Sequence, residues 1–267
     1  MERITSRQNE RVKRQAKLLR SAGERRETGT FLCEGARLCR DAVQSGICIM
    51  DFYVTESALA KYSDYCKEIE AAAERSFLIS DHVAPLLSDT KNPQGVFCVC
   101  RLPEQTVTLS KLEKTGSYLA LEQLQDPSNL GTVLRTGEAL GIAGVVLCGD
   151  CCDPFSPKVL RGSMGAVFRL PVYSCSDAPF AMEQLKAAGF CTYAAVVDAS
   201  ARLVTTVDFT KPSVMLIGNE GNGLTEAAVK ACDCPITIPM AGRAESLNAS
   251  AASSILLWEM MRTKGGI

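Results

Sequence analysis

A chain of 267 residues is long enough for one large domain or two smaller ones, and its 46% hydrophobic content is that of a globular protein with a sizeable core. It contains no run of 18 or more apolar residues and its N-terminus is densely charged, so we expect neither a membrane span nor a signal peptide. The net charge of −1 conceals a basic segment, because residues 1–40 carry eleven Lys and Arg against five acids. Such a segment is a candidate contact for a polyanion, although a solvated helix face explains the same charge density.

Thirteen cysteines and a single histidine limit the metal and redox chemistry open to the chain. Most of the cysteines lie inside apolar runs and their number is odd, which indicates small core residues kept reduced in the cytoplasm. Cys148 and Cys151 form one Cys-x-x-Cys spacing, but no second pair of matching spacing accompanies it. We therefore expect no metal site.

The first part of the chain begins with a cationic amphipathic helix, predicted over residues 5–22 with Thr5 or Ser6 as its N-cap. Short apolar strands then alternate with helices, which is typical of a small α/β unit. The strands are expected at 31–35, 47–55, 76–79 and 95–100, and the helices at 36–44, 57–75 and 81–87.

A domain boundary is predicted within residues 101–116, which hold Pro103 and mixed charges, giving domains at 1–105 and 106–267. Beyond it the alternation resumes, with strands at 118–124, 144–148, 170–174, 192–197, 214–217 and 235–238. Helices are expected at 129–140, 157–167, 179–188 and 247–261. Repeated strand–helix–strand units predict a parallel sheet covered by helices on both faces.

Two of these strands end in loops whose composition suits a ligand. The apolar strand at 214–217 runs into Gly-Asn-Glu-Gly-Asn-Gly at 218–223, where the glycines indicate positive φ angles or a close backbone approach. The strand at 235–238 ends in a loop that leads to Ser246, Leu247 and Asn248. Because the carboxyl ends of parallel strands share one edge of a sheet, these groups predict a ligand crevice there.

A third polar segment opens the helix at 129–140. Asp126 or Ser128 is the expected cap, Asn129 lies in the first turn, and Arg135 follows six residues later, about 120° around the axis. Both side chains reach one crevice only if it lies beside the N-terminal half of the helix. A buried arginine there binds an anion or pairs with a carboxylate, and an ion pair to Glu220 or Glu138 is the structural alternative.

Taken together, three segments resemble the motifs of the SpoU (TrmH-type) branch of the SPOUT RNA 2′-O-ribose methyltransferases. They are Asn129-x5-Arg135, Ile217-Gly-Asn-Glu-Gly-x-Gly223, and Ile238-Pro-Met-x-Gly-x3-Ser246-Leu-Asn248. Each motif alone is only modestly specific for this family, but the three motifs together, in this order, are a strong indication of it. The resemblance covers about residues 115–260, and residues 1–101 are similar to the N-terminal substrate-binding unit of members that act on ribosomal RNA.

The resemblance implies a small N-terminal α/β RNA-binding domain and a C-terminal parallel-sheet α/β domain tied in a trefoil knot. It implies a homodimer formed through the knot domain, S-adenosylmethionine as the methyl donor, and RNA, most often ribosomal RNA such as 23S, as the acceptor. The arginine that matches Arg135 is assigned to the ribose hydroxyl, as a base or as an electrostatic stabiliser. Asn129 and Glu220 would orient it, while Ser246 and Asn248 would complete the polar pocket.

The same resemblance assigns further roles by position. Residues expected to bind the cofactor are Gly218, Asn219, Gly221, Ile238, Met240 and Leu247. Residues expected to bind RNA, from the charge of the basic helix and from the N-terminal resemblance, are Arg11, Lys13, Arg14, Lys17 and Arg37. Two alternatives stay open, the same chemistry on transfer RNA and a non-catalytic RNA-binding protein. A dinucleotide-binding enzyme is disfavoured, because the glycines are spaced Gly-x-x-Gly-x-Gly and lie late in the chain.

Overall fold

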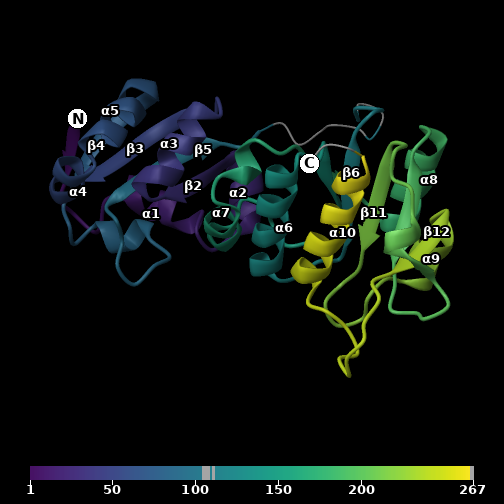
Figure 1. Cartoon of the computed structure of the whole chain (residues 1–267). Helices are drawn as coiled ribbons and strands as arrows, with labels where there is room; N and C mark the ends of the chain where they lie inside the picture. Colours follow the sequence, from purple (N-terminus) through teal and green to yellow (C-terminus); the bar gives the residue numbers. More distant parts are fainter. Residues whose placement is uncertain (104–108, 110–111, 265–267) are drawn as a thin grey trace. The chain divides into compact units, whose positions relative to one another are not determined.

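The structure is a computed structural model that describes residues 1–103, 109 and 112–264. It divides into two compact units (Figure 1). The first comprises Met1–Pro103 together with Phe155–Phe168, and the second comprises Glu104–Pro154 together with Arg169–Ile267.

The first unit is built on a five-stranded sheet with the strand order β1-β4-β3-β5-β2. Strand β4 is parallel to both β1 and β3, whereas β5 is antiparallel to both β3 and β2, so the sheet is mixed. Its strands are β1 (Glu2–Ile4), β2 (Thr30–Glu34), β3 (Ile49–Thr55), β4 (Ala73–Ile79) and β5 (Val96–Arg101). The α/β character predicted for this part of the chain is confirmed.

The helix predicted at 36–44 is confirmed, whereas the other helices predicted for the first unit are shorter or divided. The helices of this unit are α1 (Glu10–Lys17), α2 (Ala22–Thr28), α3 (Ala36–Gln44), α4 (Glu56–Lys61), α5 (Ser63–Ala72) and α7 (Pro157–Ser163), with the 3-10 turn η1 (Ala84–Leu87). The prediction of a single basic helix over residues 5–22 is wrong. Asn9 caps α1 by accepting hydrogen bonds from the backbone of Arg11 and Val12, and Ser21 caps a separate α2.

The segment Phe155–Phe168, which the sequence predicts as part of the second domain, packs within the first unit. Phe31 of β2 lies 4.8 Å from the ring of Phe155 and 6.1 Å from the ring of Phe168, centroid to centroid. The helix predicted at 157–167 is also interrupted, because Met164 adopts a left-handed φ of 51°. Aromatic packing between residues over 120 positions apart leaves no local pattern in the sequence.

The second unit contains a seven-stranded sheet with the order β10-β12-β9-β11-β6-β7-β8, and every described pair in it is parallel. Its strands are β6 (Ser117–Glu122), β7 (Gly144–Cys148), β8 (Val172–Cys175), β9 (Cys191–Ala195), β10 (Arg202–Leu203), β11 (Ser213–Ile217) and β12 (Cys234–Thr237). The predicted parallel sheet is confirmed. Because β12, β9 and β11 are neighbours, the loops that follow them open at one edge.

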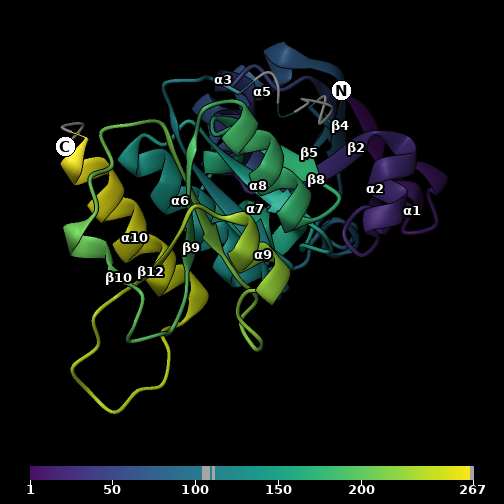
Figure 2. The ribbon, with the colours of Figure 1, turned by 90° about the vertical axis from the view of Figure 1, so that its right-hand side faces the viewer.

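Helices cover both faces of this sheet, as Figures 1 and 2 show. Helices α6 (Pro127–Leu140) and α10 (Ala249–Thr263) pack together on one face, and α8 (Ala178–Ala187) and α9 (Glu226–Ala231) pack together on the other. Helix α10 begins later than predicted, because the side chain of Asn248 accepts hydrogen bonds from the backbone of Ser250 and Ala251 and so caps it.

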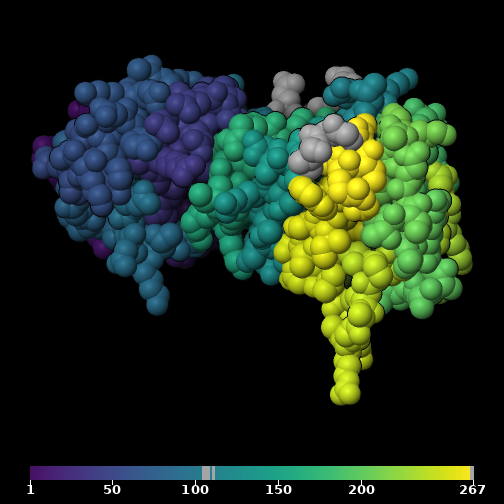
Figure 3. All heavy atoms as spheres, viewed as in Figure 1, coloured from purple at the N-terminus to yellow at the C-terminus, as the bar shows by residue number. Residues whose placement is uncertain are grey.

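The segment between β12 and α10 projects from the second unit. Figure 3 shows it as a yellow-green extension below α10. All its residues from 239 to 248 are exposed. The third motif therefore lies on a loop that reaches away from the sheet.

Candidate functional site

The edge of the seven-stranded sheet holds a cavity of about 470 Å³. The loops that follow β9, β11 and β12 line it, together with the first turns of α10. All six residues that the resemblance assigns to the cofactor line this cavity: Gly218, Asn219, Gly221, Ile238, Met240 and Leu247. Segments distant in sequence therefore converge at the place where the strand-end pattern predicts a crevice.

The glycine loop has two positions that disfavour a side chain, one by close packing and one by its backbone conformation. A Cβ atom on Gly218 would lie 2.2 Å from the carbonyl carbon of Gly223 and 2.3 Å from the backbone nitrogen of Leu224. Gly223 has a φ of 66°, and its backbone pairs in both directions with that of Asn219. Gly221 meets neither condition, because its φ is not positive and an added Cβ atom would meet only the Asn219 side chain, at 3.5 Å.

The loop after β9 also lines the cavity, and the sequence does not indicate it. Ala195, Val196 and Val197 contribute, and Val197 is 65% exposed. The sequence predicts that the strand continues through residue 197, whereas β9 ends at Ala195. The one signal is the end of an apolar strand at the same sheet edge, and it is hidden because Val196 and Val197 continue the apolar run beyond that end.

A polar network links the three motifs. The side-chain amide of Asn129 donates to Glu220 Oε1 at 2.9 Å, and the side-chain amide of Asn248 donates to Asn129 Oδ1 at 3.0 Å. The backbone N–H groups of Asp126 and Gln125 also donate to the Glu220 carboxylate, at 3.0 and 3.3 Å. Partial burial opposes the ionisation of Glu220, but these donors outweigh it, so the pKa of Glu220 lies below its usual value.

Arg135 is not the buried residue that the sequence predicts. Its side chain is exposed, and its guanidinium makes no hydrogen bond or ion pair with the described residues. Neither alternative ion pair forms, because Glu138 binds Arg169 at 2.7 Å and Glu220 is held by amides. Asn129 and Glu220 contact each other rather than Arg135, since six residues of helix separate Asn129 and Arg135 by about 9 Å along the axis.

The remaining predicted residues fall at the cavity or on the surface of the first unit. Ser246 is exposed and lines the cavity. On α1, Lys13 pairs with Glu10 at 3.0 Å, and Arg11 lies 3.5 Å from the carboxylate of Asp51. Arg14, Lys17 and Arg37 are exposed.

Other site types have little support in the part of the chain that the structure describes. Those residues include no cluster of three or more side chains able to hold a metal ion. The described helices are too short or too polar for any of them to span a bilayer. All thirteen cysteines carry free thiols, and burial raises the pKa of Cys151.

Comparison with known proteins decides the family. Residues 116–258 match the SpoU rRNA Methylase family, and residues 9–98 match the MRM3-like substrate binding domain. The chain belongs to the SpoU rRNA Methylase family. The family suggested by the three motifs is therefore confirmed.

Relatives match over nearly the full length of the chain. The 23S rRNA (guanosine(2553)-2'-O)-methyltransferase RlmP of Bacillus subtilis is 30% identical, over 97% of this chain and 99% of its own. A 23S rRNA (uridine(2479)-2'-O)-methyltransferase of Streptomyces viridochromogenes is 31% identical, over 98% and 92%. The AdoMet-bound rRNA methyltransferase of Sinorhizobium meliloti is 30% identical and superposes with a TM-score of 0.85, covering 98% of this chain and 97% of that one. The expected fold class, a SPOUT methyltransferase domain with a small N-terminal α/β domain, is confirmed.

Proposed function

We propose that this SpoU family member transfers a methyl group from S-adenosylmethionine to the ribose 2′-oxygen of a nucleotide in ribosomal RNA. The observation that carries the proposal is the convergence of all three motifs: two line one cavity, and the Asn129–Glu220–Asn248 network ties the third to them. Relatives named as 23S rRNA 2′-O-methyltransferases agree with it over almost the whole chain.

The cavity fits S-adenosylmethionine in size and lining. Its volume of about 470 Å³ falls within the range of roughly 300–1,000 Å³ typical of small-ligand pockets. Apolar side chains such as Ile238, Met240 and Leu247 would contact the adenosine, and the backbone around Gly218 would supply its hydrogen bonds. When bound, the cofactor supplies an electrophilic methyl group on a sulfonium.

The residues of this chain would catalyse chiefly by positioning. Asn129 bridges Glu220 and Asn248, so the glycine loop, the start of α6 and the start of α10 are held in one arrangement. Ser246 at the cavity wall offers a hydroxyl to the acceptor ribose. Arg135 makes no hydrogen bond or ion pair with the described residues, so its five donors are open to RNA.

We assign Arg135 to electrostatic stabilisation rather than to proton removal. A guanidinium keeps its proton above about pH 12, so it is a poor base at neutral pH. It binds a phosphate in a bidentate manner and stabilises a developing alkoxide. Arg135 would thereby hold the acceptor nucleotide and lower the energy of the charge that forms on the 2′-oxygen.

The first unit would bind RNA through its basic face. Arg11, Lys13, Arg14 and Lys17 all lie on α1, and Arg37 lies at the start of α3. Contacts of these side chains with phosphates would give affinity with little dependence on sequence. The first unit also carries the match to a substrate-binding domain, over residues 9–98.

A homodimer through the knot domain is proposed from the outer face of α10. Ile255 and Trp258 lie one turn apart there and are 42% and 48% exposed. Two large apolar side chains on one helix face are typical of a surface that a partner covers. The cytoplasm is the proposed location, since thirteen free thiols suit a reducing compartment.

Methyl transfer in vitro tests the function. Wild-type protein, S-adenosylmethionine with a labelled methyl group and unmodified ribosomal RNA should yield a 2′-O-methylated nucleotide after nuclease digestion. Arg135→Ala should lose methyl transfer by at least a hundredfold and keep cofactor affinity, as measured by calorimetry. Label appearing in transfer RNA instead favours the tRNA alternative, and cofactor binding without any transfer favours a non-catalytic RNA-binding protein.

A further inference from the structure

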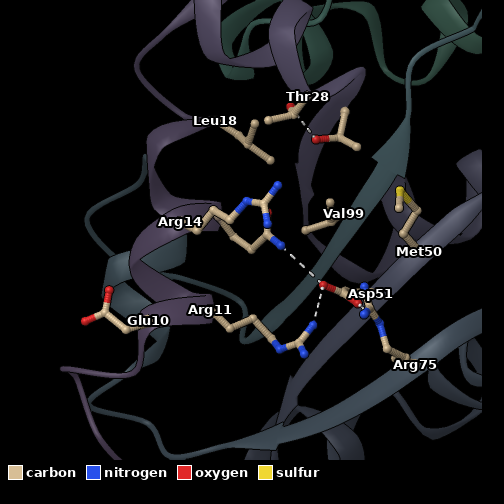
Figure 4. A pocket seen from close by; sticks show the side chains of 11 residues that line it. Glu10, Arg11, Arg14, Leu18, Thr28, Met50, Asp51, Arg75 and Val99 are labelled. Atoms are coloured by element: carbon tan, nitrogen blue, oxygen red, sulfur yellow. Dashed lines mark hydrogen bonds and ion pairs between the residues drawn. The ribbon is translucent and has the colours of Figure 1, made fainter.

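The first unit holds a second cavity, of about 400 Å³, that the proposed methyl transfer does not use. Helix α1 forms one wall, and strands β3, β4 and β5 form the floor. Figure 4 shows Arg11 and Arg14 projecting from α1 into it, with Asp51 and Arg75 on the sheet side. Its volume lies within the range of roughly 300–1,000 Å³ typical of small-ligand sites.

The floor of this cavity is the carboxylate of Asp51, whose oxygens already have several hydrogen-bond and ion-pair partners. The side chain of Asp51 is 1% exposed and accepts from Arg75 Nε at 2.7 Å, from Tyr53 Oη at 3.1 Å and from Gln15 Nε2 at 3.3 Å. Arg11 adds an ion pair at 3.5 Å, and its guanidinium also lies over the ring of Phe77, 4.8 Å from the centroid. Asp51 thus fixes two arginines in place and has little capacity left to accept from a ligand.

The cavity as a whole is positive. Asp51 offsets one of the three arginines, and Glu10 at the rim is held by Lys13, which is not part of the cavity lining. Arg14 is exposed and makes no hydrogen bond or ion pair within the described part of the chain. The site therefore presents guanidinium donors and excess positive charge, which suits an anion rich in acceptors.

The remaining lining is mixed, with Gln15, Thr28 and Thr30 on the polar side and three apolar side chains beside them. Leu18 from the end of α1, Met50 from β3 and Val99 from β5 face the same space. A phosphate alone needs no such surface, whereas a nucleobase beside its phosphate needs both an apolar contact and a cation. Size, charge and lining together match one nucleotide.

We propose that this cavity receives a single unpaired nucleotide of the RNA, with its base against Leu18, Met50 and Val99 and its phosphate on Arg11 and Arg14. This role rests on the proposed function and extends it. The first unit would recognise an unpaired nucleotide in the RNA, in addition to contacting phosphates. A bulged or looped nucleotide would enter the cavity, and a continuous duplex would not.

The test compares two synthetic RNA hairpins, identical except that one carries a single bulged 2-aminopurine nucleotide. Three full-length variants are measured beside the wild type. Met50→Trp fills the cavity without changing the charge, Arg14→Ala removes one of its cations, and Arg20→Ala removes one exposed charge outside it. Thermal unfolding and cofactor calorimetry confirm that each variant is folded.

Wild-type protein should bind the bulged hairpin at least tenfold more tightly than the paired one, with a change in 2-aminopurine fluorescence. Met50→Trp should abolish that preference, Arg14→Ala should weaken binding of the bulged hairpin about tenfold, and Arg20→Ala should weaken both hairpins equally and by less. Equal binding of the two hairpins by the wild type, or an unaltered preference in Met50→Trp, would overturn the proposal. A third result would also overturn the proposal: the wild type binds free nucleoside monophosphates, Met50→Trp does not, and both hairpins bind the wild type equally. The cavity would then be a site for a free nucleotide and not for a nucleotide of the RNA. Methyl transfer by the wild type, measured separately, reports whether the proposed function itself stands.

Discussion

The Gly218→Ala substitution tests whether the glycine loop shapes the cofactor cavity. The added methyl group would lie 2.2 to 2.4 Å from three backbone atoms of Gly223 and Leu224, so the loop must shift. Overpacking typically costs about 1–3 kcal/mol, and contact with backbone rather than with flexible side chains places this change near 3 kcal/mol. A loss of that size lowers the melting temperature by roughly 6–12 °C in a protein of this size.

Two neighbouring glycines supply matched controls. Gly221→Ala meets only the Asn219 side chain at 3.5 Å, so its stability should stay within about 0.5 kcal/mol of the wild type. Gly223→Ala has open space around the methyl group but a φ of 66°, so it should cost about 1–2 kcal/mol. Differential scanning calorimetry measures stability, and isothermal calorimetry should show at least a tenfold loss of S-adenosylmethionine affinity for Gly218→Ala. Wild-type melting temperature and affinity in Gly218→Ala would refute the close packing of this loop.

Three further predictions concern charge and assembly. Because the pKa of Glu220 is lowered from 4.5, its stabilising contribution should be complete above about pH 4.5 and lost as the pH falls through the lower folded value. The difference in melting temperature between wild type and Glu220→Gln should therefore shrink from pH 6 to pH 3, and a constant difference would contradict this. Replacing Arg11, Lys13, Arg14 and Lys17 by Ala should reduce the slope of log RNA affinity against log salt by up to roughly 3 units, and an unchanged slope would exclude α1 from the RNA contact. Trp258→Glu should convert a dimer into monomers in sedimentation velocity, whereas Phe180→Glu, which alters a similarly exposed aromatic on α8, should leave a dimer intact.

The sequence predicts the second unit better than the first, for physical reasons. Strands buried on both faces, such as Val214 to Ile217 within β11, give continuous apolar runs that are easy to recognise. The parallel sheet and the crevice at its edge follow from that pattern. The short helices of the first unit depend on capping, and Asn9 competes with Thr5 and Ser6 for the cap of the first of them.

Two features of the site depend on tertiary contacts that no local pattern encodes. The hydrogen bonds of Asn129 to Glu220 and Asn248 join residues 91 and 119 positions apart, so the motif residues were predictable but their partners were not. Arg135 is exposed whereas Asn129 on the same helix is buried. Which side of α6 is covered depends on its packing against α10, and the sequence of α6 alone does not show this. Val196 and Val197, which line the cavity after β9, continue the apolar run of that strand, so the sequence does not mark where the strand ends.

A map of ribose methylation across the ribosomal RNA of cells with and without this protein, read by mass spectrometry, tests the proposed methyl transfer in its own setting. We predict that one 2′-O-methylated nucleotide disappears in the deletion strain and returns with the wild-type chain but not with Arg135→Ala. Identical maps in the two strains would contradict the assignment of this chain as a ribosomal RNA 2′-O-methyltransferase.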